Sequence, residues 1–131
     1  MSDGRRPAWS RRRGRGAADR DLMDELATAL LNRSESTARA LLHRDVAMLV
    51  DSGGIAPVAD PLRGPGEVAA ALRTLTTETS ITAASINGAP GFVLARDGVV
   101  IGVVTAEMRR RLLTNIWVVC SPEKLRHWNR R

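Results

Sequence analysis

The hydrophobic period of this chain changes once, near Ser80, and that change limits the fold more than any other feature. Before it, apolar side chains recur at intervals of three and four, as on one face of an α-helix. After it, residues 81–120 read as strands separated by short turns. Helices followed by an antiparallel meander predict an α+β domain. Three helices packed on one curved antiparallel sheet would leave a cone, whose mouth is a natural pocket.

The expected elements follow from local signals. Asp19 precedes the first apolar period and Ser34 the second, and both are good helix N-caps. Asp97-Gly98 is a hairpin signal. Ser121-Pro122-Glu123 opens a short final helix, with Ser as the N-cap and Pro in the first helical position. The expected helices are 19–32, 35–43 and 66–75, and the expected strands are 45–51, 81–86, 92–96, 99–108 and 112–120.

The positive charge is concentrated at the N-terminus. The 131 residues carry 20 Lys and Arg against 14 Asp and Glu, a net charge of +6. Residues 1–20 hold seven Arg and two Asp, so +5 belongs to this stretch and +1 to the remainder. We therefore predict a disordered basic arm, 1–18, ahead of a single domain, 19–131. The arm is either a solvated leader or an electrostatic contact, and sequence-specific nucleic-acid binding is not expected of the domain.

Several site classes are excluded by composition. A single cysteine, Cys120, rules out an internal disulfide framework or a Cys-rich zinc site, and we expect it to be a buried structural thiol. The two histidines, His43 and His127, are far apart, and His43 is expected at the C-terminal end of the second helix. No metal or cofactor is expected. Because no apolar run approaches the ~18 residues of a membrane span, and arginines rather than an apolar segment follow the start, we expect a cytoplasmic protein without membrane contact.

Four segments, in this order, resemble one family. They are RDV…DSGG at 44–54, PLRG at 61–64, NGAPGFVL…DG at 87–98 and SPEKL at 121–125. Together they are similar to the SnoaL-like C-terminal extension of extracytoplasmic-function sigma factors of the sigma-J type. That extension has the nuclear transport factor two-like cone fold, also described as cystatin-like. The resemblance covers residues 19–128.

The resemblance implies a non-catalytic regulatory module that binds a ligand or a protein. In the family, an Asp-Gly-Gly-Gly loop and an Asn-Pro-Asp-Lys-Leu helix start implicate the extension in regulating the sigma factor. The polymerase-binding and DNA-binding sigma modules have no counterpart in this sequence, so we expect the chain to act through another protein. A sigma factor or RNA polymerase, a small apolar ligand and a second copy of the chain are the expected partners. The matching residues, and so the expected interaction surface, are Asp51, Ser52, Gly53, Gly54, Ser121, Pro122, Glu123, Lys124 and Leu125.

A small isomerase or hydrolase acting on an apolar molecule is the alternative. Period-two alternation places Leu113, Asn115, Trp117 and Val119 on one strand face. If Glu107 and Asn115 pointed inward beside Trp117, they would form a pocket in which a desolvated Glu107 could act as a general acid or base. Asp51 is the second candidate for that role. Otherwise Glu107 faces solvent opposite the Arg109, Arg110 and Arg111 turn, and no residue is catalytic.

Overall fold

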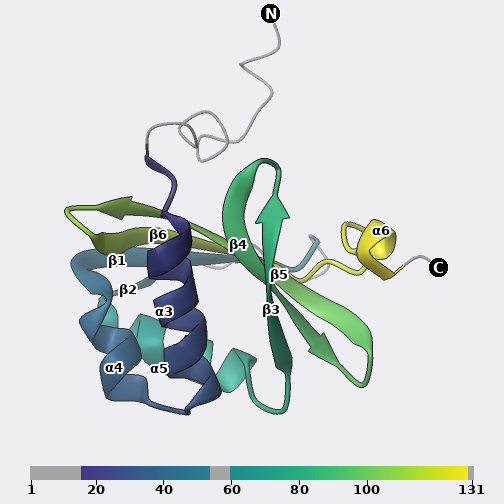
Figure 1. Ribbon diagram of the computed structural model, residues 1–131, viewed down its shortest axis with the longest axis horizontal. Helices are drawn as coiled ribbons and strands as arrows, with labels where there is room; N and C mark the ends of the chain where they lie inside the picture. The colour runs from purple at the N-terminus through teal and green to yellow at the C-terminus, as the bar shows by residue number, and fades with distance from the viewer. Residues whose placement is uncertain (1–15, 54–59, 130–131) are drawn as a thin grey trace, which may run out of the picture.

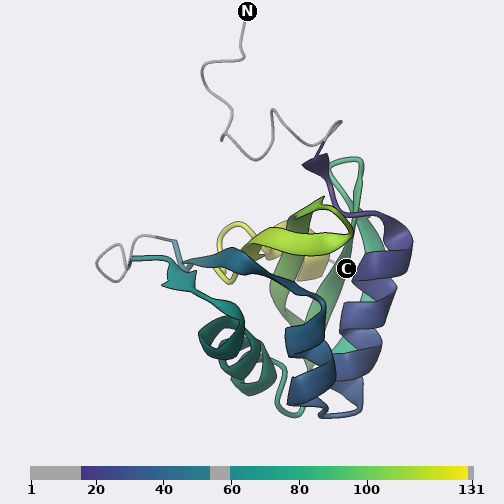
Figure 2. The same cartoon turned by 90° about the vertical axis from the view of Figure 1, so that its left-hand side faces the viewer.

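The computed structural model describes residues 16–53 and 60–129 and shows one curved sheet with helices on both of its faces (Figure 1). The helices are α3 (Arg20–Leu31), α4 (Glu35–Ala40), α5 (Pro65–Leu75) and α6 (Arg126–Asn129). The strands are β1 (Leu42–Asp51), β2 (Leu62–Arg63), β3 (Ser80–Ile86), β4 (Ala89–Arg96), β5 (Val99–Arg109) and β6 (Leu112–Val119). Helices α3, α4 and α5 lie together on one side of the sheet, and α6 lies apart from them (Figures 1 and 2). The α+β architecture is as predicted.

Helices α3, α4 and α5 begin within one residue of the predicted positions, because their start signals are local. The prediction for the final helix was wrong: residues 122–125 form turns, and α6 begins only at Arg126. The Asp19 side chain accepts a hydrogen bond from the Leu22 N–H at 2.9 Å, and α3 follows. The Ser34 hydroxyl accepts one from the Thr37 N–H at 3.3 Å at the start of α4. Helix α5 has no side-chain cap and starts with Pro65, whose fixed φ suits the first helical position.

Helix α4 ends at Ala40, earlier than the predicted 35–43, and the following strand is correspondingly longer. Leu42 is buried in the core, and the Leu41 carbonyl accepts a hydrogen bond from the Leu113 N–H at 2.9 Å. Leu41 and Leu42 therefore pair with β6 in the sheet instead of continuing helix α4. The expectation that His43 sits at a helix C-terminus is wrong: it lies in β1, where its Nδ1 accepts the Asp45 N–H at 3.0 Å.

The strand order is β2-β1-β6-β5-β4-β3. Strands β3 to β6 form the predicted antiparallel meander. The sheet is nevertheless mixed, because β1 pairs with β6 in parallel. The chain leaves β1, crosses through α5 and completes the meander before β6 returns beside it in the same direction. The expectation of an entirely antiparallel sheet was wrong at this pair.

A β-bulge in β6 decides which side chains share a face. Glu107 pairs with Asn115, and Met108 pairs with Leu113, so Thr114 is the extra residue. Leu113 consequently joins the helix-side core, whereas Asn115 and Trp117 point to the other face. The predicted alternation, which placed Leu113 with Asn115 and Trp117, fails at this one residue.

The helix side of the sheet is a packed apolar core. Its members come from α3, α4, α5 and every strand of the meander except β3, together with β1. Because these side chains fill the space between helices and sheet, the interior of the cone is closed by packing. The largest fully buried side chains in it are Phe92, Met23, Leu26, Leu72, Leu94, Leu113 and Ile116.

Residues 16–18, which the sequence assigned to the arm, belong to the folded domain. The Ala18 N–H donates to the Ala106 carbonyl at 2.9 Å, and Ala17 forms a β-bridge with Glu107. Ala18 is completely buried. The domain thus starts at or before Gly16 instead of at Asp19. The rest of the predicted arm, residues 1–15, lies outside the described residues.

Candidate functional site

A cavity of about 550 Å³ lies on the sheet face opposite α3, α4 and α5. On β6, Trp117 and Val119 point into it, while the alternate residues Ile116 and Val118 belong to the helix-side core. Two of the three tryptophans of the chain line this cavity. Among the described residues, its lining is Leu49, Asp51, Ile86, Asn87, Val103, Trp117, Val118, Val119, Lys124, Leu125, His127 and Trp128.

One wall of the cavity is the C-terminal strap, by which we mean residues 121–129. At one end, Lys124 Nζ contacts Asp51 Oδ2 at the end of β1, at 2.6 Å. At the other end, the Asn129 amide accepts the Val100 N–H at 2.7 Å and donates to the Val100 carbonyl at 3.1 Å. Between these ties, Leu125 is buried against β3 and β5. Trp128 packs against the same cluster, so the strap is docked on the sheet by its apolar side chains.

The loop after β1 and the start of the strap are in direct contact. The Asp51 carbonyl accepts the Cys120 N–H at 2.8 Å, and Asp51 Oδ1 accepts the Gly53 N–H at 2.9 Å. Gly53 has a φ of +90°, and a Cβ at this position would lie 2.6 Å from the Ser121 Oγ. A side chain is therefore excluded twice, by backbone conformation and by space.

The structure accordingly brings together most of the predicted interaction residues, from two segments about seventy positions apart. Ser121 and Leu125 are buried and anchor the strap, whereas Ser52, Pro122 and Glu123 are exposed. Gly54 lies outside the described residues.

Two ionisable groups at this junction have shifted pKa values. The pKa of Asp51 is lowered, first by the hydrogen bond from Lys124 and then by the Gly53 N–H. Burial raises the pKa of the Cys120 thiol, and the nearby Asp51 carboxylate raises it further. Cys120 therefore stays protonated at neutral pH, which suits a structural thiol better than a nucleophile.

The Asp51–Lys124 pair makes stability depend on acid pH. Because the folded-state pKa of Asp51 lies below its ordinary value of 3.8, the pair stabilises the fold above that pH and the contribution is lost as pH falls through the folded-state pKa. Both side chains are partly exposed, so Asp51→Asn should lower the free energy of unfolding by only about 0.5 kcal/mol at pH 7. Urea unfolding should show no difference between variant and wild type near pH 2. A difference that persists there would contradict this assignment.

Glu107 lies elsewhere on the same face. It is 5 % exposed, and its Oε1 accepts the Asn115 Nδ2 at 3.1 Å. A Cβ on Gly16 would lie 3.6 Å from Glu107 Cδ, so the chain at residue 16 covers this carboxylate. The alternative in which Glu107 faces solvent is therefore wrong. Glu107 is buried with Asn115 on the sheet face that carries Trp117, but neither Glu107 nor Asn115 lines the cavity beneath the strap.

Of the three predicted pocket residues, only Trp117 lines the cavity beneath the strap. Sequence reasoning missed Leu49, Ile86 and Val103 as lining residues. Each of the three is an apolar residue in a strand, and the sequence alone shows that much. Which face of the strand carries a cavity depends on the strand register, which the sequence does not show.

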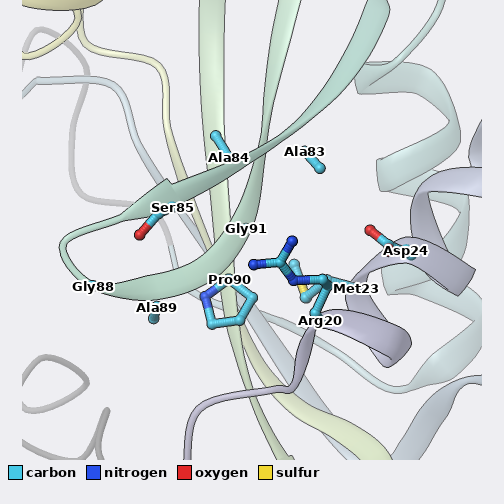
Figure 3. A pocket seen from close by; sticks show the side chains of 10 residues that line it. All are labelled: Arg20, Met23, Asp24, Ala83, Ala84, Ser85, Gly88, Ala89, Pro90 and Gly91. Atoms are coloured by element: carbon cyan, nitrogen blue, oxygen red, sulfur yellow. The ribbon is translucent and has the colours of Figure 1, made fainter.

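A second cavity, of about 380 Å³, lies between α3 and the β3–β4 hairpin (Figure 3). Figure 3 shows the Arg20 side chain reaching toward the hairpin beside Pro90, with Asp24 on the same helix. The hairpin wall consists of small residues, including Ala83 and Ser85. This cavity offers one charge of each sign but little apolar surface.

Within residues 16–53 and 60–129, no group of three or more His, Cys, Asp or Glu side chains is placed to hold a metal ion. The helices of this same part of the chain are all too short or too polar to cross a bilayer.

No family model and no curated protein matches the sequence. Solved structures do match. The sigma factor SigJ of Mycobacterium tuberculosis aligns with a TM-score of 0.63 and 22% identity over 80% of this chain and 42% of the sigma factor. The chain has the nuclear transport factor two-like cone fold. The chain spans about two fifths of the length of SigJ.

Two other bacterial proteins align over a larger share of their own length. A cystatin-like protein from Silicibacter pomeroyi has a TM-score of 0.59 and 19% identity over 80% of this chain and 77% of its own. An NTF2-like protein of unknown function from Cytophaga hutchinsonii has a TM-score of 0.55 and 13% identity over 81% and 92%. At these identities the comparisons establish the cone fold.

Proposed function

We propose that this cone-fold chain is a non-catalytic regulatory module that binds a sigma factor or RNA polymerase. The observation that carries the proposal is the junction of two segments distant in the sequence. The loop that begins at Asp51 and the strap that begins at Ser121 form one continuous surface, joined by the 2.6 Å contact of Lys124 with Asp51. The structural similarity to SigJ supports the choice of a sigma factor or RNA polymerase as the partner.

The positions of the acidic side chains favour binding over catalysis. An isomerase or hydrolase would need Glu107 or Asp51 to reach a substrate in a cavity. Glu107 does not line the cavity beneath the strap and is covered by residue 16. Asp51 does line it, but Lys124 and Gly53 hold its carboxylate, and the lowered pKa makes it a weak base. Asp51 lies opposite Val119 and Glu107 opposite Asn115, so the two acids are four residues apart along β6, on the order of 13 Å, and cannot act as a pair.

The test is direct binding to purified RNA polymerase holoenzyme and to the isolated sigma factor, measured at two salt concentrations. A chain lacking residues 1–15 is the right comparison, because residues 16–18 pack on the sheet. We expect this shortened chain to bind as the full chain does, and Lys124→Glu to weaken binding at least tenfold. Glu107→Gln should leave binding unchanged.

Arg73→Glu is the matched control, since it makes the same charge change at a half-exposed position on α5, on the other side of the sheet. Binding that requires residues 1–15 and disappears at higher salt would indicate nonspecific electrostatics and overturn the proposal. Equal sensitivity to Lys124→Glu and Arg73→Glu would also overturn it. Size measurement on the free chain shows whether a second copy occupies the surface instead.

A further inference from the structure

We infer that the cavity beneath the C-terminal strap is a binding site for a small aromatic or polycyclic molecule that carries one anionic group. This inference deepens the binding role proposed above, because it names a ligand class and a place for it. The place differs from the one that the sequence suggested, which was the mouth of the cone. Its experiment uses a small molecule and no protein partner, so the two proposals can fail separately.

The cavity has the size and surface of a small-molecule site. Its volume of about 550 Å³ falls within the range of about 300–1,000 Å³ that is usual for ligand pockets. The floor contains the buried side chains of Ile86, Val103 and Leu125. Trp117 on β6 and Trp128 on the strap both line the cavity, and indole rings supply large apolar faces to a flat ligand.

The polar groups of the lining indicate the charge of the ligand. Lys124 and His127 are on the strap, Asn87 is at the β3–β4 turn, and the one carboxylate of the described lining, Asp51, is paired with Lys124. Within residues 16–53 and 60–129, Lys124 Nζ contacts one carboxylate, Asp51, and an ammonium has three donors. An anionic group could therefore approach Lys124 without displacing Asp51, while the ring system covers the apolar floor.

A small molecule fits this surface better than a second sheet. The strap crosses the strands and is bonded to them near both of its ends, by Lys124 to Asp51 and by Asn129 to Val100. The resulting surface is concave and interrupted, whereas a sheet-to-sheet contact needs a continuous flat face. Leu49, 38 % exposed, is an accessible apolar residue of the lining.

The experiment is a titration of the full chain with anilinonaphthalene sulfonate, a fused-ring probe with one sulfonate. Binding is measured by probe fluorescence and by the indole N–H signals in proton–nitrogen NMR spectra. We expect saturable binding of one probe per chain, with shifts of the Trp117 and Trp128 signals. Trp9 lies outside the described residues, and its indole signal serves as the internal reference. The Trp128→Phe variant lacks one signal, which identifies the signals of Trp128 and Trp117.

Leu49→Arg and Val50→Arg form the matched pair. Both positions are exposed on β1, but Leu49 lies beside Trp117 and Val50 beside Val118, on opposite faces. Leu49→Arg should weaken probe binding at least tenfold and Val50→Arg less than twofold. Lys124→Ala provides a second variant and should weaken binding severalfold without touching the apolar floor.

Three outcomes would overturn the inference. They are the absence of saturable binding, equal effects of Leu49→Arg and Val50→Arg, and indole shifts confined to Trp9. A change of the chain from dimer to monomer with Leu49→Arg, with no probe binding to either form, would assign the face to a second copy. Far-ultraviolet circular dichroism on each variant confirms that it is folded before its binding is compared.

Discussion

Gly91→Ala should lower the free energy of unfolding by about 3 kcal/mol, near the upper end of the usual cost of overpacking. A Cβ at this position would lie 2.5 Å from the Val104 carbonyl oxygen and 2.6 Å from Ile86 Cδ1. The carbonyl belongs to the adjacent strand β5 and cannot move without disturbing the ladder between β4 and β5. Ile86 also lines the cavity beneath the strap, so its displacement should weaken probe binding there.

Gly102→Ala is the matched control, because Gly102 is also a buried strand glycine of the meander. Its Cβ would meet Leu94 Cδ1 at 3.4 Å, an ordinary contact. Since alanine restricts the unfolded chain more than glycine does, this change should lie within about 1 kcal/mol of neutral. Urea unfolding followed by tryptophan fluorescence compares the two. Equal losses at both positions would contradict the close approach at Gly91.

Phe92→Ala should cost about 3–5 kcal/mol, as is usual for the loss of a buried phenyl ring. Phe92 is 1 % exposed and is the largest fully buried side chain in the described part of the chain. It occupies the helix side of the sheet, so the substitution opens a hole in the interior of the cone. Because small domains are stable by only about 5–15 kcal/mol, the variant should melt far below the wild type.

This substitution also tests where a ligand can bind. Phe92→Leu, which keeps most of the volume, should cost roughly 1–2 kcal/mol. A Phe92→Ala protein as stable as Phe92→Leu would mean that the interior is loosely packed. The helix side would then be a second candidate ligand site, beside the cavity beneath the strap. Thermal unfolding of the three proteins decides between these results.

Much of the fold was predictable from local signals in the sequence. The caps at Asp19 and Ser34 and the hairpin at Asp97-Gly98 depend on a few adjacent residues, and the structure contains them as expected. The helix-then-strand order, read from hydrophobic period alone, determined the α+β class. Family resemblance, and not spacing, grouped the Asp51 loop with the start of the strap, and the 2.6 Å contact of Lys124 with Asp51 joins them.

The site was less predictable because it depends on contacts between distant segments. The single extra residue at Thr114 determines that Leu113 and Asn115 lie on opposite faces, and no local pattern shows where such a bulge falls. The burial of Glu107 depends on residue 16, about ninety positions earlier in the chain.

The sequence by itself therefore determined the class of the fold, the order of its elements and most of their ends, because these depend on neighbouring residues. Only the tertiary structure decided that β1 lies parallel to β6, that the interior of the cone is filled and that the cavity lies beneath the strap. These features depend on strand register and on the path of residues 121–129 across the sheet. Both are set by the sum of many weak contacts between segments far apart in the chain.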